Sequence, residues 1–305
     1  MGTIIKIEFI HVTKLLKKEY EIRNLNFGIE EKTIYALYGK DRIRQPVIMK
    51  MAAGLLTPDS GEVRMLGENL QKKKSFVLKH VGYLPQIPAS YPNLSVEDNL
   101  KLLERLRPRH RREMTETVMK QMGLCDFRRQ KAQMLETEQK KRLGLAMALL
   151  HDPELLLLND PFGGLDSGSV KEISSLFRNL CREYGKTIFL NCYNLDEIEK
   201  LADCIGYLEQ GNLIREFPIK EREEINRQFI CIVSENITNI IPVMERDLKI
   251  TQYDVMDDNR LRIYDLTRDS GEINRYLFEK GISVKEIYMH TGTLQEHLDE
   301  ISRRH

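Results

Sequence analysis

Residues 33–61 read TIYALYGKDRIRQPVIMKMAAGLLTPDSG, and this stretch indicates the fold. Residues 33–38 form an apolar run that ends at Gly39, which predicts a short buried strand. Apolar residues then recur at helical spacing over residues 47–56, and a cluster of turn-forming residues follows at 57–61. A strand, a loop and a helix in this order are typical of the first unit of a parallel α/β sheet.

The rest of the first two-thirds of the chain continues this alternation. Residues 155–158 are four consecutive leucines bounded by polar residues, as expected of a strand that is buried on both faces. The region around 95–150 has a helical pattern with a turn at residues 122–123. Further short strands are predicted at residues 81–84, 187–191 and 205–208.

The pattern changes after about residue 220. Strands are predicted at 229–233, 251–255, 261–264 and 284–289, and helices at 237–245, 271–279 and 294–303. The order βαββαβ plus a terminal helix is that of a small ferredoxin-like α+β domain. The sequence therefore predicts two domains, residues 1–219 and residues 220–305.

Composition limits the function. The 305 residues include 47 Lys and Arg against 46 Asp and Glu, so the net charge of +1 argues against nucleic acid as a partner. The apolar runs are too short to span a bilayer, and no signal peptide is visible. Any membrane link is therefore expected to go through a partner. The five cysteines are scattered without a CxxC pair, which favours reduced thiols in a cytoplasmic protein.

These landmarks resemble, in order and spacing, the nucleotide-binding subunits of ABC transporters, especially exporter types with a C-terminal accessory domain. Residues 34–61 are similar to the Walker A strand, loop and helix, and residues 81–86 (VGYLPQ) to the Q-loop. Residues 139–153 resemble the helix that follows the signature motif. Residues 155–161, together with residues 164–166, resemble the Walker B motif and the D-loop. Residues 194–203 resemble the helix that follows the H-loop. The resemblance implies an ABC-type P-loop NTPase-like fold with a helical subdomain at about 87–150.

The Walker A position departs from the family's pattern. A working loop uses glycines to wrap the phosphates, a lysine on the β- and γ-phosphates and a hydroxyl on Mg²⁺. Here Gly39 is kept, but Arg42 and Arg44 replace the next two glycines. Gln45 replaces the lysine and has no charge. Pro46 replaces the hydroxyl residue and has neither a ligand oxygen nor an N–H donor.

Other positions carried over from the family differ in the same direction. The Walker B aspartate, a metal ligand, is Asn159, and the catalytic glutamate is Asp160. The H-loop histidine is Tyr193. The adenine-stacking aromatic falls near Leu16, with Tyr20 close by. Two positions keep the family's residues, namely Gln86 and Asp166.

The signature position, which in the family binds the partner's nucleotide, reads LETEQ at residues 135–139. Glu136 and Glu138 place carboxylates where a polyanion would dock, next to Gln139. They also complement the dipole of the following helix. Because ABC subunits dimerise head to tail, Arg42 and Arg44 would face these glutamates in a homodimer. We hypothesise that the charges replace ATP in holding such a dimer together; the alternative is that the arginines are solvated surface residues.

The sequence thus favours a pseudo-ATPase subunit at the inner face of the cell membrane, coupled to a membrane permease through the surface at residues 86–100. It would pair with itself or with an active ATPase subunit. No cofactor is expected to bind tightly, and ATP and Mg would bind only if the altered site still functions. One alternative is a slow but active ATPase of a drug or peptide exporter with Asp160 as base. Another is a soluble scaffold or regulator.

Overall fold

The computed structural model of the protein describes residues 4–17, 20–106 and 114–304. Contacts along the chain divide it into two compact units, Met1–Pro218 and Ile219–His305. Residues 107–113, which belong to the stretch expected to be helical, lie outside the described part. None of the described helices has both the length and the apolar composition needed to cross a membrane.

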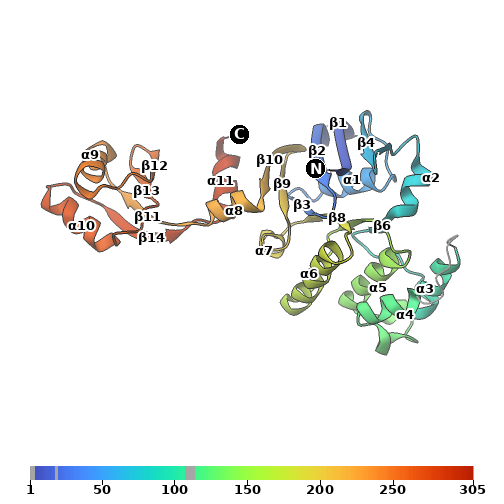
Figure 1. The fold of residues 1–305 in the computed structure, drawn as a ribbon. Coiled ribbons are helices and arrows are strands. Elements are labelled where there is room, and N and C mark those ends of the chain that lie inside the picture. The colour runs from blue at the N-terminus through green and yellow to red at the C-terminus, as the bar shows by residue number, and fades with distance from the viewer. Residues whose placement is uncertain (1–3, 18–19, 107–113, 305) are drawn as a thin grey trace. The chain divides into compact units, whose positions relative to one another are not determined.

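The N-terminal unit contains a six-stranded sheet in the order β10-β9-β3-β8-β7-β6 (Figure 1). Five strands are parallel, and β10 pairs with β9 in the antiparallel direction. All residues of β3, β7 and β8 are buried, which confirms that the leucine run is covered on both faces. The strands are β3 (Ile34–Tyr38), β6 (Val81–Leu84), β7 (Leu155–Asn159), β8 (Thr187–Cys192), β9 (Cys204–Glu209) and β10 (Asn212–Pro218).

A second, antiparallel sheet in the order β2-β1-β4-β5 was not predicted from the sequence. Its strands are β1 (Ile5–Lys17), β2 (Tyr20–Glu30), β4 (Ser60–Met65) and β5 (Glu68–Asn69). Its inner face shares one hydrophobic core with helix α1 (Arg44–Ala52) and with one face of the large sheet. In this core, Phe9 and Phe27 stack with ring centroids 4.6 Å apart, and Phe189 lies edge-on to both rings.

Helix α1 begins earlier and ends earlier than the predicted range of 47–56. It starts at Arg44 because side-chain and backbone contacts of the preceding loop satisfy its first amides. Pro46 lies within its first turn, where proline is tolerated. It ends at Ala52 because Gly54 adopts a φ of +64°, a left-handed conformation that glycine accepts at low cost.

The remaining helices of the N-terminal unit include a group formed by α3, α4 and α5, beside α6 (Figure 1). The region expected as a helix at 194–203 contains only one α-helical turn, α7. The bounds are α2 (Lys74–Val77), α3 (Val96–Arg105), α4 (Met114–Gln121), α5 (Thr137–Leu149), α6 (Ser167–Arg182) and α7 (Leu195–Ile198).

From β11 onward the C-terminal unit has the element order predicted from the sequence, but a helix that was not predicted, α8, precedes it. Its antiparallel sheet runs β12-β13-β11-β14, and one face packs on α9 and α10 (Figure 1). The predicted helix at 237–245 is instead a 3₁₀ turn, one α-turn and a π-helical turn in succession. The elements are α8 (Ile219–Ile225), β11 (Gln228–Val233), α9 (Ile240–Val243), β12 (Tyr253–Asp257), β13 (Arg260–Ile263), α10 (Ser270–Glu279), β14 (Glu286–Thr291) and α11 (Leu294–Arg304).

Candidate functional site

The segment at residues 39–47, called the loop below, consists of the loop that follows the carboxyl end of β3 and the first turn of α1. Strand β3 lies in the middle of the large sheet. The ends of β7 and β8 lie on the same edge, because all three strands are parallel. Open α/β sheets place their ligand sites at this edge. Gly39 is required here by a close approach, since a Cβ at this position would lie 2.3 Å from the backbone oxygen of Leu208. None of the residues in this fully described loop has a positive φ.

The carboxylate of Asp41 is bound by groups of the loop itself. Its Oδ1 accepts hydrogen bonds from the backbone amides of Ile43 and Arg44, both at 3.0 Å. The Arg44 guanidinium donates to the other oxygen in a short ion pair. Burial alone would raise the pKa of this carboxyl, but these hydrogen bonds outweigh it and hold the Asp41 pKa below its ordinary value. The amides at the start of α1 therefore bind an anion that belongs to the chain.

The two arginines of the loop also contact neighbouring residues of the same chain. Besides Asp41, Arg44 donates from Nε to the backbone oxygen of Glu21 at 2.8 Å, and its guanidinium lies 5.1 Å from the ring centroid of Tyr20. The Arg42 guanidinium lies 4.6 Å from the ring centroid of Tyr193. The positions that correspond to the loop glycines and to the H-loop histidine are thus filled by an arginine–tyrosine stack.

Gln45 is completely buried and faces the loop from the first turn of α1. Its Nε2 donates to the backbone oxygen of Gly39 at 3.0 Å, which directs the side chain back onto the loop. Its Oε1 has no hydrogen-bond partner among the described residues. Pro46 follows and offers neither an amide nor a hydroxyl. An uncharged amide and a proline ring therefore stand at the two positions that the sequence resemblance assigns to the lysine and the hydroxyl residue.

The ends of β7 and β8 contribute a buried polar pair. Asn159 and Asn191 face each other in register and are 1% and 0% exposed. The backbone amide of Asp160 donates to Oδ1 of Asn191 at 2.8 Å. Within the described part of the chain, Oδ1 of Asn159 and Nδ2 of Asn191 have no hydrogen-bond partner. Such groups without a partner are uncommon in protein interiors, so this asparagine pair is an unusual feature of the edge.

Asp160 and Tyr193 complete the edge. Asp160 has a φ of +53°, a left-handed conformation that is uncommon for a residue with a Cβ but that aspartate tolerates better than most. Burial raises the pKa of the Tyr193 hydroxyl to about 12, the negative charge of Asp160 adds to the shift, and Arg42 opposes it. Tyr193 is therefore a neutral hydroxyl at physiological pH, and it cannot carry the positive charge available to a histidine.

Lys141, which sequence reasoning missed, connects this edge to the segment at residue 86. Its Nζ donates to the backbone oxygen of Gln86 at 3.2 Å and, in a shorter bond, to that of Asp160. The side chain is almost fully buried, and burial lowers the Lys141 pKa while the Asp160 charge opposes the shift. Nothing in the sequence around Lys141, which lies on α5 four residues after Thr137, indicates that its side chain contacts the end of β7.

Asp41 could have been recognised from the sequence as a residue that binds backbone amides, because an aspartate shortly before a helix commonly caps that helix.

The residues at the signature position have partners within the chain. Glu138 pairs with Arg142 at 2.8 Å, and Oε1 of Gln139 accepts from the backbone amide of Glu136 at 2.9 Å. Within the described residues, no hydrogen bond or ion pair joins Glu136 or Glu138 to the loop at 39–47. In a protomer the charge of Glu138 is therefore paired with Arg142, while the carboxylate of Glu136 caps α5. A role of these charges in holding a dimer stays a prediction.

The two positions that keep the family's residues lie on exposed parts of the unit. Gln86 is exposed at the start of the segment that follows β6. Asp166 caps α6, where its Oδ1 accepts from the backbone amide of Ser169 at 2.8 Å, and this bond holds the Asp166 pKa below its ordinary value. Across the described ranges, no group of three or more His, Cys, Asp and Glu side chains could hold a metal ion.

Comparison with known proteins gives concordant results. A family described as "ABC transporter" matches residues 22–163. The chain is 31% identical to the bacitracin transport ATP-binding protein BcrA of Bacillus licheniformis over 97% of its own length and 96% of the relative's. It is 30% identical to the protein of the same name from Enterococcus faecalis, over 97% of each chain.

Solved structures show the same fold. The ATP-binding cassette MJ0796, in a dimer bound to ADP and phosphate, matches with a TM-score of 0.64 at 23% identity, over 70% of this chain and 98% of that one. The protein cbiO1 of Clostridium perfringens matches with a TM-score of 0.64 at 20% identity, over 81% and 97%. Together with the sequence relatives, these matches establish that the chain belongs to the family of ABC transporter ATP-binding proteins.

Proposed function

We propose that this chain is a cassette subunit of an ABC exporter that binds a membrane permease but does not bind or hydrolyse Mg-ATP. The main observation in support of the proposal is that the carboxylate of Asp41 is bound by backbone amides of its own loop. The amides of Ile43 and Arg44, which begin α1, already donate to it. Such amides are the ordinary phosphate donors at a helix N-terminus. A triphosphate would have to displace Asp41 and then lie beside its charge.

Electrostatics make this displacement unfavourable. Two unit negative charges 4 Å apart repel by about 1 kcal/mol in water and about 4 kcal/mol at an effective dielectric of 20. The loop has no lysine to offset that repulsion, because the Gln45 side chain is neutral and turned onto Gly39. The arginines would have to leave Tyr20 and Tyr193 in order to reach a phosphate. These residues do not fit a nucleotide.

The same edge is a poor site for Mg²⁺. This hard cation needs a near-octahedral arrangement and is usually held by one or two carboxylates together with substrate phosphates. The side chain of Pro46 supplies no oxygen, and Asn159 supplies an uncharged amide oxygen where the family has a carboxylate. The remaining acid at this edge is Asp160, whose backbone amide and backbone oxygen are held by Asn191 and Lys141. We therefore infer a structural or regulatory role for this cassette.

Turnover measurements test the proposal against its main alternative, a slow ATPase with Asp160 as base. We expect the full chain and an Asp160→Ala variant to hydrolyse Mg-ATP at the same background rate. The assay is phosphate release at saturating nucleotide with the protein pure and intact. A wild-type rate well above background that disappears in Asp160→Ala would contradict the proposal and support the enzyme.

Binding to a permease is supported by exposed apolar side chains on the segment at residues 86–100. Ile87 is 84% exposed and Tyr91 is 54% exposed, and nearby Met134 is 66% exposed. Backbone hydrogen bonds join this segment to residues 130–134, for example from Gln133 N to Pro92 O at 3.0 Å. Large exposed apolar side chains gathered in this way indicate a protein interface.

The double variant Ile87→Asp with Tyr91→Asp is expected to lose the permease. Introducing charge into an apolar contact costs about 2 kcal/mol or more at a central position, so binding should weaken at least about 30-fold. Recovery of a multi-spanning membrane partner from detergent-solubilised membranes measures this. Leu55→Asp is the matched control, because Leu55 is 64% exposed elsewhere in the same unit. Equal recovery with both variants would argue against docking through this segment.

The nearly full-length similarity to bacitracin transport proteins extends through the C-terminal unit. It supports an exporter of antibiotic-like peptides, located at the cytoplasmic face of the membrane. The dimeric arrangement of the cassette MJ0796 supports pairing with a second cassette, either a copy of this chain or an active subunit. In the second case the partner would supply ATP turnover, and this chain would complete the assembly.

A further inference from the structure

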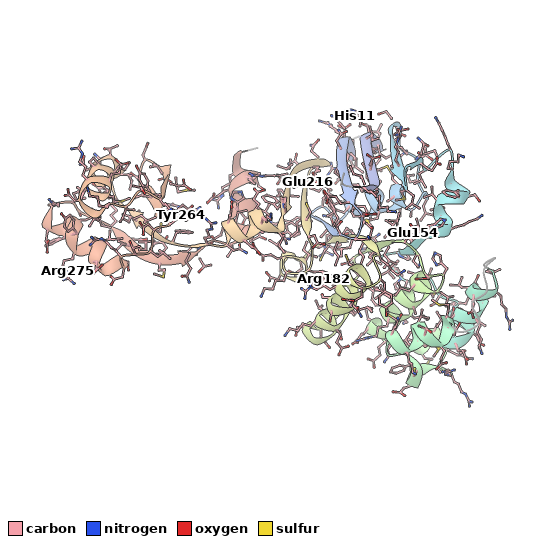
Figure 2. The ribbon with its side chains drawn as sticks, viewed as in Figure 1. His11, Glu154, Arg182, Glu216, Tyr264 and Arg275 are labelled. Atoms are coloured by element: carbon pink, nitrogen blue, oxygen red, sulfur yellow. The ribbon has the colours of Figure 1, made fainter. Side chains whose placement is uncertain are left out.

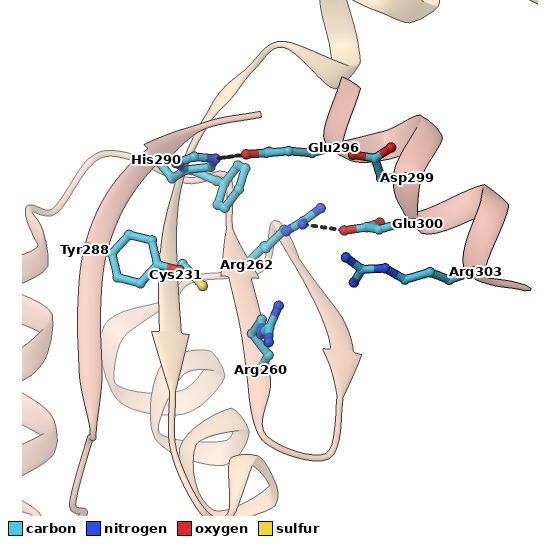
Figure 3. A pocket seen from close by; sticks show the side chains of 10 residues that line it. Cys231, Arg260, Arg262, Tyr288, His290, Glu296, Asp299, Glu300 and Arg303 are labelled. Carbon is cyan, nitrogen blue, oxygen red and sulfur yellow. Dashed lines mark hydrogen bonds and ion pairs between the residues drawn. The ribbon is translucent and has the colours of Figure 1, made fainter. Parts of the chain in front are cut away.

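The sheet of the C-terminal unit has two different faces. Side chains alternate along a strand, so residues two apart share a face. Ile230 and Ile232 of β11 and Leu261 and Ile263 of β13 form the core with α9 and α10. The opposite face carries polar and aromatic residues, and α11 lies across part of it (Figure 3).

A pocket of about 290 Å³ lies between this face and α11. Its volume is close to the lower end of the range for small-molecule sites, roughly 300 Å³. The pocket lies entirely within the C-terminal unit, so it does not depend on the nucleotide edge. Its walls are formed by Phe229, Cys231 and Arg262 on the inner strands, Tyr288 and His290 on β14, and acidic and basic residues of α11.

The acidic side chains of the pocket already have partners. Glu300 pairs with Arg262 at 2.9 Å, and the Arg262 guanidinium also lies 4.8 Å from the ring centroid of Phe229. Glu296 contacts Nε2 of His290 at 3.0 Å. Asp299 accepts a hydrogen bond from Gln295 at 3.0 Å. These contacts fix α11 against the sheet, and they engage each acidic side chain with a residue other than Arg260 or Arg303.

Two arginines of the pocket are not neutralised within it. Among the residues that the structure describes, the one ion-pair partner of Arg260 is Asp257, at 3.9 Å. Both side chains are 54% exposed, and Asp257 does not line the pocket. Arg303 has no ion pair or hydrogen bond with any residue that the structure describes. Figure 3 shows both guanidinium groups turned into the space between β13 and α11. Two like charges that converge on one concavity favour an anion between them.

We infer that this pocket binds a small organic anion, whose carboxylate or phosphate group is held between Arg260 and Arg303 with the exposed ring of Tyr288 at its side. Guanidinium groups suit this task because their planar donor arrangement matches both groups in a bidentate manner. Tyr288 is 43% exposed and adds a flat surface for the body of the ligand. The site would allow the accessory unit to respond to a metabolite or to a lipid headgroup.

Titration calorimetry of the full chain tests this inference with succinate, phenyl phosphate and inorganic phosphate, and with neutral succinamide as the uncharged probe. We expect saturable binding of at least one anion, none of succinamide, and weakening as salt is raised. Arg260→Gln with Arg303→Gln should weaken binding by about tenfold or more, and Arg303→Lys should weaken it less. Arg275→Gln is the matched control, since Arg275 is an exposed arginine on α10, away from the pocket (Figure 2).

Flotation with phosphatidylglycerol vesicles distinguishes the source of the anion. Vesicle binding that the double variant loses and the control keeps identifies a headgroup phosphate as the ligand, and soluble binding without vesicle binding identifies a free metabolite. Melting curves of the variants show whether the unit stays folded; because both arginines lie at the surface, we expect no change. If no probe binds the wild type, or if the double variant binds as well as Arg275→Gln does, the inference is wrong.

Discussion

Rebuilding the loop and the end of β7 is expected to give this chain Mg-ATP binding that it otherwise lacks. The rebuilt variant restores two glycines, a lysine, a hydroxyl and an acidic metal ligand through Arg42→Gly, Arg44→Gly, Gln45→Lys, Pro46→Ser and Asn159→Asp. Each change reinstates a contact to phosphate or Mg²⁺. We expect affinity to rise by about 1,000-fold, which corresponds to about 4 kcal/mol. Calorimetry with Mg-ATP on the full chain measures it.

Two further variants separate the contributions. The rebuilt variant with Gln45 retained should bind far more weakly, because the charge on the phosphates is then unmatched. Adding Asp41→Asn to the rebuilt variant should tighten binding, because the competing carboxylate is removed from the amides of Ile43 and Arg44. A rebuilt variant that remains folded and binds no better than the wild type would show that the loop is not what prevents binding.

The second large effect concerns stability. Phe189 is completely buried in β8 and lies edge-on to Phe9, Phe27 and Tyr35, with ring centroids 5.8 to 6.3 Å away. Replacing it with alanine removes these contacts and leaves a cavity between the two sheets. Phe189→Ala should lower the free energy of unfolding of the N-terminal unit by about 3–5 kcal/mol. Urea denaturation followed by circular dichroism measures the change.

Phe76→Ala is the matched control for this substitution, because Phe76 lies in the same unit. The same side chain is removed, but Phe76 is 52% exposed on α2, so the free energy of unfolding should change by less than about 1 kcal/mol. Phe189→Leu keeps most of the volume and should cost less than about 1.5 kcal/mol. Similar losses for Phe189→Ala and Phe76→Ala would show that the aromatic cluster does not hold the two sheets together.

The sequence predicts the fold correctly in those segments where the residue pattern is compatible with a single type of structure. The leucines at 155–158 are apolar on both sides of the strand, so only a covered, central position suits them, and β7 occupies one. The order of strands and helices after residue 228 likewise indicated the antiparallel C-terminal sheet. The first sheet was missed although Ile7 and Phe9 alternate with polar residues, because β1 and β2 are long and interrupted by irregular register.

The site could be predicted only in part. Sequence comparison with the family located the loop and the substituted positions, because these depend on order along the chain. It could not show that the Asp41 carboxylate turns onto the amides of its own loop or that Arg42 stacks on Tyr193. The contact from Lys141 to the backbone oxygen of Asp160 joins α5 to the end of β7, and spacing in the sequence carries no information about it.

The most direct test of the account is calorimetric titration of the intact wild-type chain with Mg-ATP. Because Asp41 occupies the amides at the start of α1, and because Gln45 has no charge and Pro46 no hydroxyl to offer a phosphate or Mg²⁺, we predict no saturable binding up to roughly 1 mM nucleotide. Saturable binding with a dissociation constant in the micromolar range, lost when Asn159 and Asp160 are replaced by alanine, would contradict it.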